Sequence, residues 1–293
     1  MVSTPGYTHD DLLAELPGLH RYARHLVGTR SGVDPDDLVQ DVVERALARA
    51  DTFRGESSLR TWLHRMLHHR FLDVCRRDRS VPTEDADLMA RIEASWRDDA
   101  YTVDLDAVLH RVEVGDDLRD ALAHLPVPMR SAVLLHDVEG LTVAEIAAIQ
   151  GIGLPAAKQR LRRGRTALVS LLDGQIDRRR PTPEVPLRCW KARSLIGDYL
   201  ADELAPARRV AVETHLGACP TCPALYAALV GVRDAAGRLR GADDARDPNS
   251  VVPSPIADLV RARTAPPTAD DRPGYADSPT TRPPLPTRAP RAR

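Results

Sequence analysis

Aromatic residues are scarce in this chain of 293 residues, where Phe, Trp and Tyr together make up 4%. Ala, Leu, Val and Arg dominate instead, and this composition favours packed helices over sheets. The sequence also lacks any apolar run that approaches the roughly 20 residues a membrane-spanning helix needs. Its first residues contain neither a cationic start nor an apolar stretch, so no signal peptide is expected. We therefore expect a cytoplasmic protein without a membrane partner.

An excess of charge of either sign is absent as well. The chain has 41 Lys and Arg residues and 42 Asp and Glu residues, and its net charge is −1. Basic character must then be local, as in a protein with one DNA-binding face and acidic faces for other partners. Cysteine is also rare. Four cysteines in a cytosolic chain argue against a disulfide framework and favour metal or redox roles.

Periodicity and composition divide the chain into five predicted segments. Two have strong apolar periodicity of the helical type, and the acidic, irregular stretch between them is predicted to be a linker with room for a short helix. A small unit containing Cys and His follows. The last segment is rich in proline and has almost no large apolar residues, so it is predicted to be disordered. The segments are residues 9–80, the linker 81–115, residues 116–174, the Cys/His unit 187–240 and the tail 241–293.

Residues 141–165 contain the most informative pattern, two predicted helices around a tight turn. Thr142 can cap the first helix, and Glu145 can complete a capping box. Gly151 breaks the pattern, and Pro155 suits the first turn of the second helix. The second helix carries the cations Lys158, Arg160, Arg162, Arg163 and Arg165. This layout predicts a helix-turn-helix whose second helix enters the major groove of DNA, although a helical hairpin with a solvated basic face would have a similar pattern.

A helix with an acidic face is predicted to begin at Asp34, with Pro35 in its first turn. Its buried face is expected to consist of Leu38, Val42, Val43, Ala46 and Leu47. The polar side at helical spacing consists of Asp37, Gln40, Asp41 and Glu44. By itself, this polar side is equally consistent with a solvated surface.

The next predicted helix follows the loop Phe53–Ser58, and Ser57 or Ser58 can cap it. Its core stripe is expected to contain Leu59, Trp62, Leu63, Met66, Leu67, Phe71 and Val74. The other face carries Arg60, His64, Arg65, His68, His69, Arg70, Arg76, Arg77 and Arg79. Basic side chains beside an aromatic-bearing helix suit a surface that holds melted single-stranded DNA. The alternative is that Trp62 belongs to the core and the arginines are only solvated.

Two long stretches resemble one known family. Residues 34–80 closely resemble region 2 of the extracytoplasmic-function (ECF) group of sigma-70-family factors, with the sequence DPDDLVQDVVERALARADTFRGESSLRTWLHRMLHHRFLDVCRRDRS. Residues 118–172 resemble region 4 of the same group, with the sequence LRDALAHLPVPMRSAVLLHDVEGLTVAEIAAIQGIGLPAAKQRLRRGRTALVSLL. The order and spacing of the two halves match. The resemblance implies an all-α fold with two helical sigma domains joined by a linker. With the predicted Cys/His unit and the Pro-rich tail, the full expectation adds a small helical zinc-binding domain and a disordered C-terminal segment.

The resemblance also implies roles for particular residues. In this family, region 2 binds the clamp helices of the large catalytic subunit of RNA polymerase, and the matching positions are Asp37, Gln40 and Asp41. The following loop and helix read and melt the −10 element, with Gly55, Glu56 and Ser57 near the flipped base and Arg60, Trp62, Arg65 and His69 near the strand. Flipping a base costs a few kcal/mol, which the protein contacts must offset.

Region 4 of the family docks its helix-turn-helix on the −35 duplex. The matching residues are Lys158, Gln159, Arg162 and Arg163, of which Gln159 is a candidate for reading adenine. The chain departs from the family pattern in its recognition helix, where Gly153-Leu154-Pro155 and Gly164 are irregular. These departures leave the promoter sequence open.

The Cys/His unit contains Cys189, His215, Cys219 and Cys222, in the pattern C-x25-H-x3-C-x2-C. Four nitrogen and sulfur ligands are typical of a closed, tetrahedral zinc site. The alternative is four unrelated reduced side chains, and Cys75 lies apart on a predicted buried helix face. The unit resembles the zinc-binding anti-sigma domain, which in its family binds sigma regions 2 and 4 and blocks polymerase.

Two functions compete at this point. The first is an RNA polymerase sigma factor that binds core polymerase and promoter DNA and is regulated in cis by the zinc unit, by masking or by thiol oxidation. In a second version of this hypothesis, the zinc unit is purely structural. A separate anti-sigma protein or another regulatory protein is a further candidate partner. The alternative is a free-standing helix-turn-helix regulator, which would not need residues 34–79. An enzyme is not expected, because a catalytic zinc usually keeps an open position whereas four ligands are available here.

Overall fold

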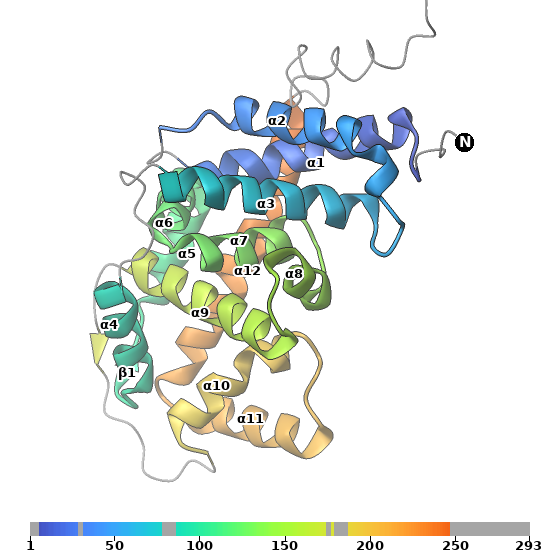
Figure 1. Cartoon of the computed structure of the whole chain (residues 1–293). Helices are drawn as coiled ribbons and strands as arrows, with labels where there is room; N and C mark the ends of the chain where they lie inside the picture. The colour runs from blue at the N-terminus through green and yellow to red at the C-terminus, as the bar shows by residue number, and fades with distance from the viewer. Residues whose placement is uncertain (1–5, 29–31, 78–85, 174–176, 179–186, 247–293) are drawn as a thin grey trace, which may run out of the picture.

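The computed structural model describes residues 6–28, 32–77, 86–173, 177–178 and 187–246. Nearly all of them lie in helices, which confirms the predicted all-α fold class. The first helical unit is drawn at the top of Figure 1 and packs as three helices. These are α1 (His9–Val27), α2 (Pro35–Ala48) and α3 (Leu59–Arg77), with the short 3-10 helix η1 (Ala50–Thr52) after α2.

The predicted caps of the first unit are present. The Asp34 side chain accepts a hydrogen bond from the backbone of Asp36 at the start of α2, and the Ser58 hydroxyl accepts one from the Thr61 backbone at the start of α3. Leu38, Val42, Val43 and Ala46 of α2 are buried, as are Leu63, Leu67 and Phe71 of α3. Cys75 is also buried in this core, as expected. The apolar stripes of the sequence therefore become the faces along which the three helices meet.

The second helical unit contains the predicted helix-turn-helix. Its elements are α6 (Asp116–His124), α7 (Val127–Val133), the π-helical turn η2 (Leu134–Val138), α8 (Val143–Gln150) and α9 (Leu154–Asp173). Thr142 and Glu145 form the capping box at the start of α8. Gly151 ends α8 in the left-handed conformation with φ at 65°, which a glycine adopts at little cost.

The predicted linker is more ordered than its composition suggests, and the expectation of an irregular segment is wrong. It contains α4 (Ala86–Arg97), the strand β1 (Tyr101–Thr102) and α5 (Leu105–Val114). β1 pairs antiparallel with β2 (Asp177–Arg178). Met89, Ile92 and Trp96 form a buried stripe on α4 at helical spacing. The charged residues Arg91 and Glu93 lie between them on other faces of the helix and make this stripe less visible in the composition.

The Cys/His unit consists of α10 (Cys189–Leu200), α11 (Pro206–Ala218) and α12 (Cys222–Arg246). The predicted break near Pro206 is present, and α12 continues past residue 240, where the tail is predicted to begin. The rest of the predicted tail, residues 247–293, lies outside the described residues. No single helix in the described ranges is long and apolar enough to cross a membrane, although α11 and the first part of α12, bent by 111°, pass that test as a pair.

The long helix α12 joins the Cys/His unit to the rest of the protein. It packs along α5, α9 and η2, and Figure 1 shows it running behind the second helical unit. Its buried face includes Leu225, Leu229, Val232 and Leu239 and belongs to the same hydrophobic core as the two sigma-like units. The Cys/His unit is thus anchored in the main core rather than resting on a small core of its own.

Candidate nucleic-acid interface and metal centre

The acidic side of α2 faces outward. Asp37 and Gln40 are exposed, and Gln40 donates a hydrogen bond to Glu44 at 3.1 Å. Asp41 is half-buried and accepts a hydrogen bond from Arg70 of α3 at 2.6 Å. These side chains line a shallow hollow whose other described walls also come from α2, α3 and the residues just before α2. A partner could reach this surface without any rearrangement of the described residues.

The loop between η1 and α3 is also exposed. Gly55, Glu56 and Ser57 all lie at the surface, and Gly55 has φ at 71°, a conformation that favours glycine. Trp62 is half-buried between Tyr7 and Phe53, with ring centroids 6.0 and 5.3 Å away. Trp62 therefore packs in an aromatic cluster, and the loop presents its polar residues to solvent.

The basic face of α3 divides into exposed and buried parts. Arg65 and His69 are exposed. His64 and His68, which the sequence places on the same basic face, are instead buried, so that expectation is wrong for these two residues. His68 approaches Ser131 of α7, with 3.1 Å between Nδ1 and Oγ. The reason is that α1 and α3 pack against the second helical unit, a contact between distant segments that periodicity cannot reveal.

Arg60 is engaged by the second helical unit. It donates a hydrogen bond at 2.9 Å to a carboxylate oxygen of Glu139 and another to the Glu139 backbone oxygen. The carboxylate of Glu139 is completely buried and also accepts hydrogen bonds from Arg21 of α1 at 2.8 and 3.1 Å. One acidic side chain of the second unit thus neutralises two arginines of the first. Sequence analysis did not identify Glu139, whose partners lie far away in the chain.

The cations on α9 have partners outside the helix-turn-helix. Lys158 forms ion pairs with Glu203 and, at 3.9 Å, with Asp198 of the Cys/His unit. The guanidinium of Arg162 lies over the ring of Trp190, 5.8 Å from its centroid. Those three partners were missed from the sequence, because nothing in their local pattern distinguishes them from an ordinary helix surface.

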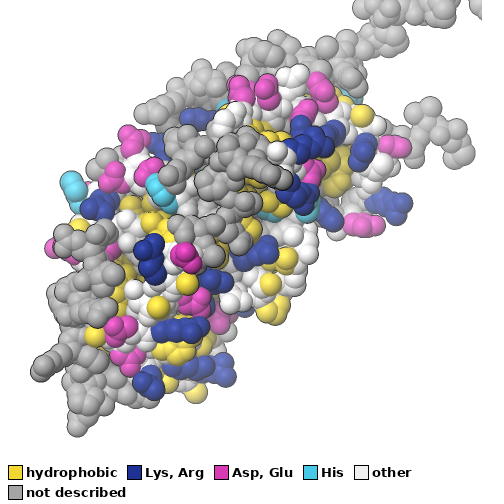
Figure 2. Space-filling model, turned by 60° about the vertical axis from the view of Figure 1, so that its left-hand side comes forward, with side chains coloured by type: hydrophobic (Ala, Val, Ile, Leu, Met, Phe, Trp, Pro, Cys, Tyr) yellow, Lys and Arg dark blue, Asp and Glu magenta, His cyan; other side chains and the backbone are white. Residues whose placement is uncertain are grey.

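Two further residues of α9 complete the predicted reading face. Arg163 pairs with Glu93 of α4 at 3.3 Å, and Gln159 is exposed. On the face drawn in Figure 2, Lys and Arg side chains are interspersed with Asp and Glu rather than gathered in one basic surface. Three of the four residues that the sequence predicts to meet the −35 duplex thus contact other parts of the chain.

Two irregular features of α9 have a structural role. Arg165 is buried and pairs with Asp137 of η2, with 3.0 Å between Nε and Oδ2. A Cβ atom at Gly164 would lie 2.7 Å from Cγ2 of Val133 and 3.1 Å from the backbone oxygen of Met129. Glycine at position 164 therefore allows α7 and α9 to pack at close range. The departure from the family pattern at this position is accounted for by this packing.

Cys189, His215, Cys219 and Cys222 converge at one point, as the sequence predicts. One ligand atom from each residue lies within 4.8 Å of the others, and all four residues are buried. Cys189 begins α10, His215 and Cys219 lie at the end of α11, and Cys222 begins α12. Among the described residues, neither ring nitrogen of His215 has a hydrogen-bond partner, a costly state for a buried imidazole without a bound ion.

The sulfur atoms of the cluster are close together and shielded from water. Cys189 and Cys219 are 3.6 Å apart between their Sγ atoms. Burial, followed by the neighbouring cysteines, raises the pKa of the Cys189 thiol to about 12. A metal ion would reverse this, because a coordinated thiol is deprotonated. A buried set of three thiols and one imidazole suits a tetrahedral zinc ion.

Arg193 connects the cluster to the linker, and the sequence analysis did not identify it. Its guanidinium is buried and donates hydrogen bonds to the backbone oxygens of Asp98 at 2.7 Å and Tyr101 at 2.8 Å. Its Nε also donates to the Sγ atom of Cys222 at 3.3 Å. The side chain therefore holds the linker backbone against one of the candidate metal ligands.

Comparison with protein families divides the chain in the same way. The family model of sigma-70 region 2 matches residues 12–81, and that of sigma-70 region 4 matches residues 115–168. A zinc-finger family model matches residues 191–222, a range that includes three of the four candidate ligands and begins just after Cys189.

Several curated proteins are similar over more than half of this chain. The ECF RNA polymerase sigma factor SigM of Mycobacterium tuberculosis is 35% identical over 155 residues, which cover 53% of this chain and 71% of SigM. The ECF RNA polymerase sigma factor EcfG of Rhodopseudomonas palustris is 33% identical over 171 residues, covering 57% of this chain and 87% of EcfG. Among solved structures, the sigma factor RpoE in complex with the anti-sigma factor NepR from Bartonella quintana matches with 27% identity and a TM-score of 0.40, covering 56% of this chain and 94% of that one.

Proposed function

The chain belongs to the ECF group of RNA polymerase sigma factors, and on this premise we propose that its own C-terminal Cys/His unit holds it in a closed, inactive state. A sigma factor is a transcription initiation factor and not an enzyme. It binds core RNA polymerase and directs it to promoter DNA. Since region 2 is present, the alternative of a regulator that uses only a helix-turn-helix is not retained.

The pairing of Lys158 with Glu203 and Asp198 is the observation that carries the proposal. In a promoter complex, cations on the second helix of a helix-turn-helix meet phosphates or base edges. Here two carboxylates take the place of phosphates, and the Trp190 ring takes the place of a base beside Arg162. The Cys/His unit thereby occupies the predicted −35 contacts Lys158 and Arg162, while Gln159 remains exposed.

One of the predicted −10 contacts, Arg60, is restrained by the second helical unit instead. Arg60 is held by Glu139, whereas Arg65, His69 and the loop residues Gly55, Glu56 and Ser57 are exposed. Melted DNA would have to compete with Glu139 for Arg60. Region 2 and region 4 also bind promoter elements that are separated along the duplex, so we expect the two units to part before both elements are read.

We assign polymerase binding to Asp37, Gln40 and Asp41, as the family resemblance implies. Asp37 and Gln40 remain exposed in the closed arrangement, which supports contact with the polymerase before the DNA-binding side chains are released. Polymerase is itself cytoplasmic, and we place the action of this protein there. A separate regulatory protein could compete for the same cations on α9.

We assign a structural zinc ion to Cys189, His215, Cys219 and Cys222. The burial of all four residues and the unpartnered imidazole of His215 support the assignment. Bound zinc would supply a fixed junction between the ends of α10, α11 and α12. This junction sets the position of α10, and α10 carries Asp198 toward Lys158.

Run-off transcription with core polymerase tests the closed state in the full chain. The Asp198→Asn/Glu203→Gln double variant removes both carboxylates that face Lys158. Partly exposed ion pairs contribute about 0.2–1 kcal/mol each, so loss of both pairs should raise transcript by about two- to thirtyfold. Glu213→Gln is the matched control, because Glu213 is exposed on α11 of the same unit and faces Tyr199 rather than α9. Equal transcript from the double variant, the control and the wild type would refute inhibition in cis.

A further inference from the structure

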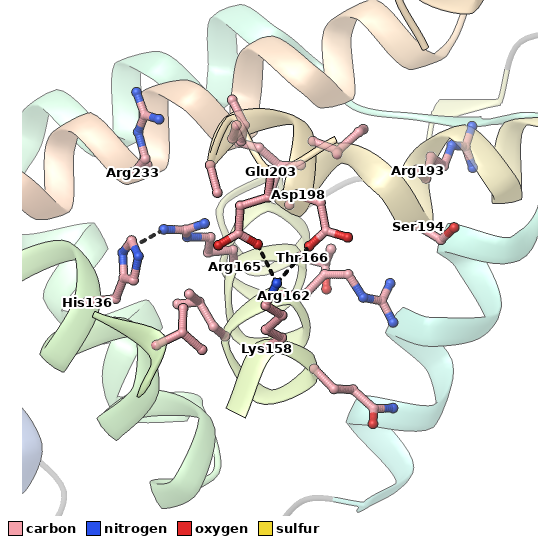
Figure 3. Close-up of a pocket in the computed structure, with 18 of the residues that line it drawn as sticks. His136, Lys158, Arg162, Arg165, Thr166, Arg193, Ser194, Asp198, Glu203 and Arg233 are labelled. Carbon is pink, nitrogen blue, oxygen red and sulfur yellow. Dashed lines mark hydrogen bonds and ion pairs between the residues drawn. The ribbon is translucent and has the colours of Figure 1, made fainter. Parts of the chain in front are cut away.

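A cavity of about 340 Å³ lies at the contact between α9 and the Cys/His unit (Figure 3). Its walls come from α9 on one side and from α10 and α12 on the other, with Val143 and His136 contributing from the second helical unit. Much of the surface is apolar, formed by Val143, Pro155, Leu161, Ile196, Leu200 and Leu229. Cavities of this size and lining are typical of sites for small molecules with a substantial apolar body.

The charged residues around the cavity are predominantly cationic. Five Lys and Arg side chains line it, against the two carboxylates of Asp198 and Glu203. Figure 3 shows both carboxylates directed at Lys158, so that the positive charge of this lysine is already offset within the cavity wall. Of the remaining cations, Arg165 is paired with Asp137 and Arg193 with backbone oxygens. Two guanidinium groups remain that form no ion pair with another helix within the described residues.

Those two groups are Arg162 and Arg233. Arg162 contacts the Trp190 ring but forms no ion pair or hydrogen bond within the described residues. Burial is the main cause that lowers the pKa of Arg162, and the nearby carboxylates of Glu93 and Asp198 offset it only in part. Arg233 pairs only with its chain neighbour Asp234, at 3.0 Å among the described residues. Figure 3 shows these two side chains on opposite sides of the cavity, so an anionic group would supply an ion-pair partner to Arg162 or a second one to Arg233.

We propose that this cavity binds a small amphipathic anion, with an apolar body and one carboxylate, sulfonate or phosphate group, that keeps the sigma factor closed. The ligand is expected to stabilise the closed state because the cavity walls come from both sides of the contact. A ligand that contacts α9 and the Cys/His unit together binds only when the two are in contact, and so it stabilises the closed state. The ligand would therefore act as a repressor, and its loss would be the activating signal. This inference rests on the proposed inhibition in cis.

Binding is tested on the full chain with two fluorescent probes that share an apolar body. 8-Anilinonaphthalene-1-sulfonate carries an anion, and N-phenyl-1-naphthylamine is its neutral counterpart. We expect the sulfonate to bind at least about tenfold more tightly. Arg233→Gln should weaken the sulfonate several-fold and leave the neutral probe unchanged. Equal affinities of the two probes for the wild type would overturn the assignment of an anion site.

A second variant locates the probe without changing any charge. Gly197 lines the cavity, and a Cβ atom there would meet only Cγ of Arg162, at 4.0 Å. Gly197→Leu should fill the cavity and abolish binding of both probes. Gly217→Leu is the matched control, since a Cβ atom at Gly217 meets nothing within 4 Å and the residue lies on α11, outside the cavity. Undiminished binding to Gly197→Leu would show that the cavity is not the site.

Run-off transcription then tests the repressor role. The sulfonate should lower transcript several-fold with the wild type and with Gly217→Leu, but not with Gly197→Leu. Any decrease that occurs with Gly197→Leu would reveal a direct effect of the probe on polymerase. Binding in the cavity with unchanged or increased transcript would overturn the repressor role. The closed state itself is tested separately by the Asp198→Asn/Glu203→Gln variant, so failure of the ligand proposal and failure of cis inhibition give different results.

Discussion

Glu139 of the second helical unit forms a buried ion pair with Arg21 of the first, with 2.8 Å between Oε1 and Nε across a separation of 118 residues. Burial alone would raise the pKa of Glu139. The hydrogen bond from Arg21 and the nearby positive charges outweigh burial and hold this pKa below its usual value. The carboxylate is therefore ionised in the folded protein, and it ties regions 2 and 4 together.

Glu139→Gln should destabilise the protein strongly. The substitution keeps the shape of the side chain but removes the negative charge that pairs with buried Arg21 and with Arg60. Removing one member of a buried pair costs about 3–5 kcal/mol, and we expect an effect near the lower end because Gln can still accept one hydrogen bond. Urea unfolding followed by circular dichroism measures the change. Exposed Glu113→Gln on α5 serves as the control, and a difference between the two variants below about 0.5 kcal/mol would contradict the prediction.

Stability should decrease as the solution becomes mildly acidic. Burial lowers the pKa of His68 to about 3, and the charges of His69 and Arg160 contribute to the shift. An unfolded histidine titrates near pH 6.5, so below that pH the unfolded chain takes up a proton that the folded chain does not bind. The free energy of unfolding should then fall by up to about 1.4 kcal/mol per pH unit for this residue, a loss that continues toward pH 3.

Variants can show how much of this pH dependence of stability comes from His68. His68→Gln should reduce the slope of unfolding free energy against pH between about pH 6.5 and 5. The expected reduction is nearly that for one bound proton, about 1.4 kcal/mol per pH unit. His110→Gln replaces an exposed histidine of α5 and serves as the matched control. Identical slopes for both variants would assign the acid sensitivity to other groups. Zinc content has to be checked at each pH, because ligand protonation releases metal.

Gly164→Ala should weaken the packing of the recognition helix. The added Cβ atom would lie 2.7 Å from a methyl carbon of Val133, so α7 or α9 must shift. Overpacking of this kind costs about 1–3 kcal/mol, which we expect as a lower melting temperature in calorimetry. Gly217→Ala is the matched control, because it also lies in a helix but has open space around the Cβ position. Its free energy of unfolding should increase by about 0.5–1 kcal/mol, since alanine has the higher helix propensity. A stabilised Gly164→Ala protein would contradict the close approach.

Removal of the metal should loosen the Cys/His unit. We expect about one zinc ion per chain in the purified protein, a lower melting temperature after chelation, and more run-off transcript, because structural zinc contributes directly to folding free energy. Cys222→Ser should lose the zinc. Cys75→Ser alters a buried cysteine outside the cluster and should retain it. Purified wild-type protein without zinc, or equal zinc content in both variants, would rule out the assigned site.

The features that sequence predicted well are local ones. The capping box of Thr142 and Glu145 and the Gly151 turn depend on residues within a few positions of each other, and so their pattern is visible in the chain. The Cys219 and Cys222 pair, close to His215, is local in the same sense. Amphipathic periodicity likewise identified the faces of α2 and α3 that meet in the core.

The relationships between units could not be predicted in this way. Lys158 meets Glu203 across 45 residues, and His68 meets Ser131 across 63, and neither pair has a periodic or compositional signal. A buried histidine and a solvated one look alike on a helical wheel, which explains the misplacement of His64 and His68. The linker was predicted to have room for only a short helix, because charged residues of both signs surround the narrow apolar stripe of α4.

The contact between Lys158 and Glu203 joins two parts of one polypeptide, and this determines how it responds to protein abundance. A tethered pair meets at an effective concentration that the intervening chain sets, on the order of millimolar for short flexible connections. Dilution of the protein cannot separate the pair, and greater synthesis supplies both members in equal number. Release must therefore come from a change in the folded equilibrium of each molecule, and the number of copies in the cell sets only the size of the response.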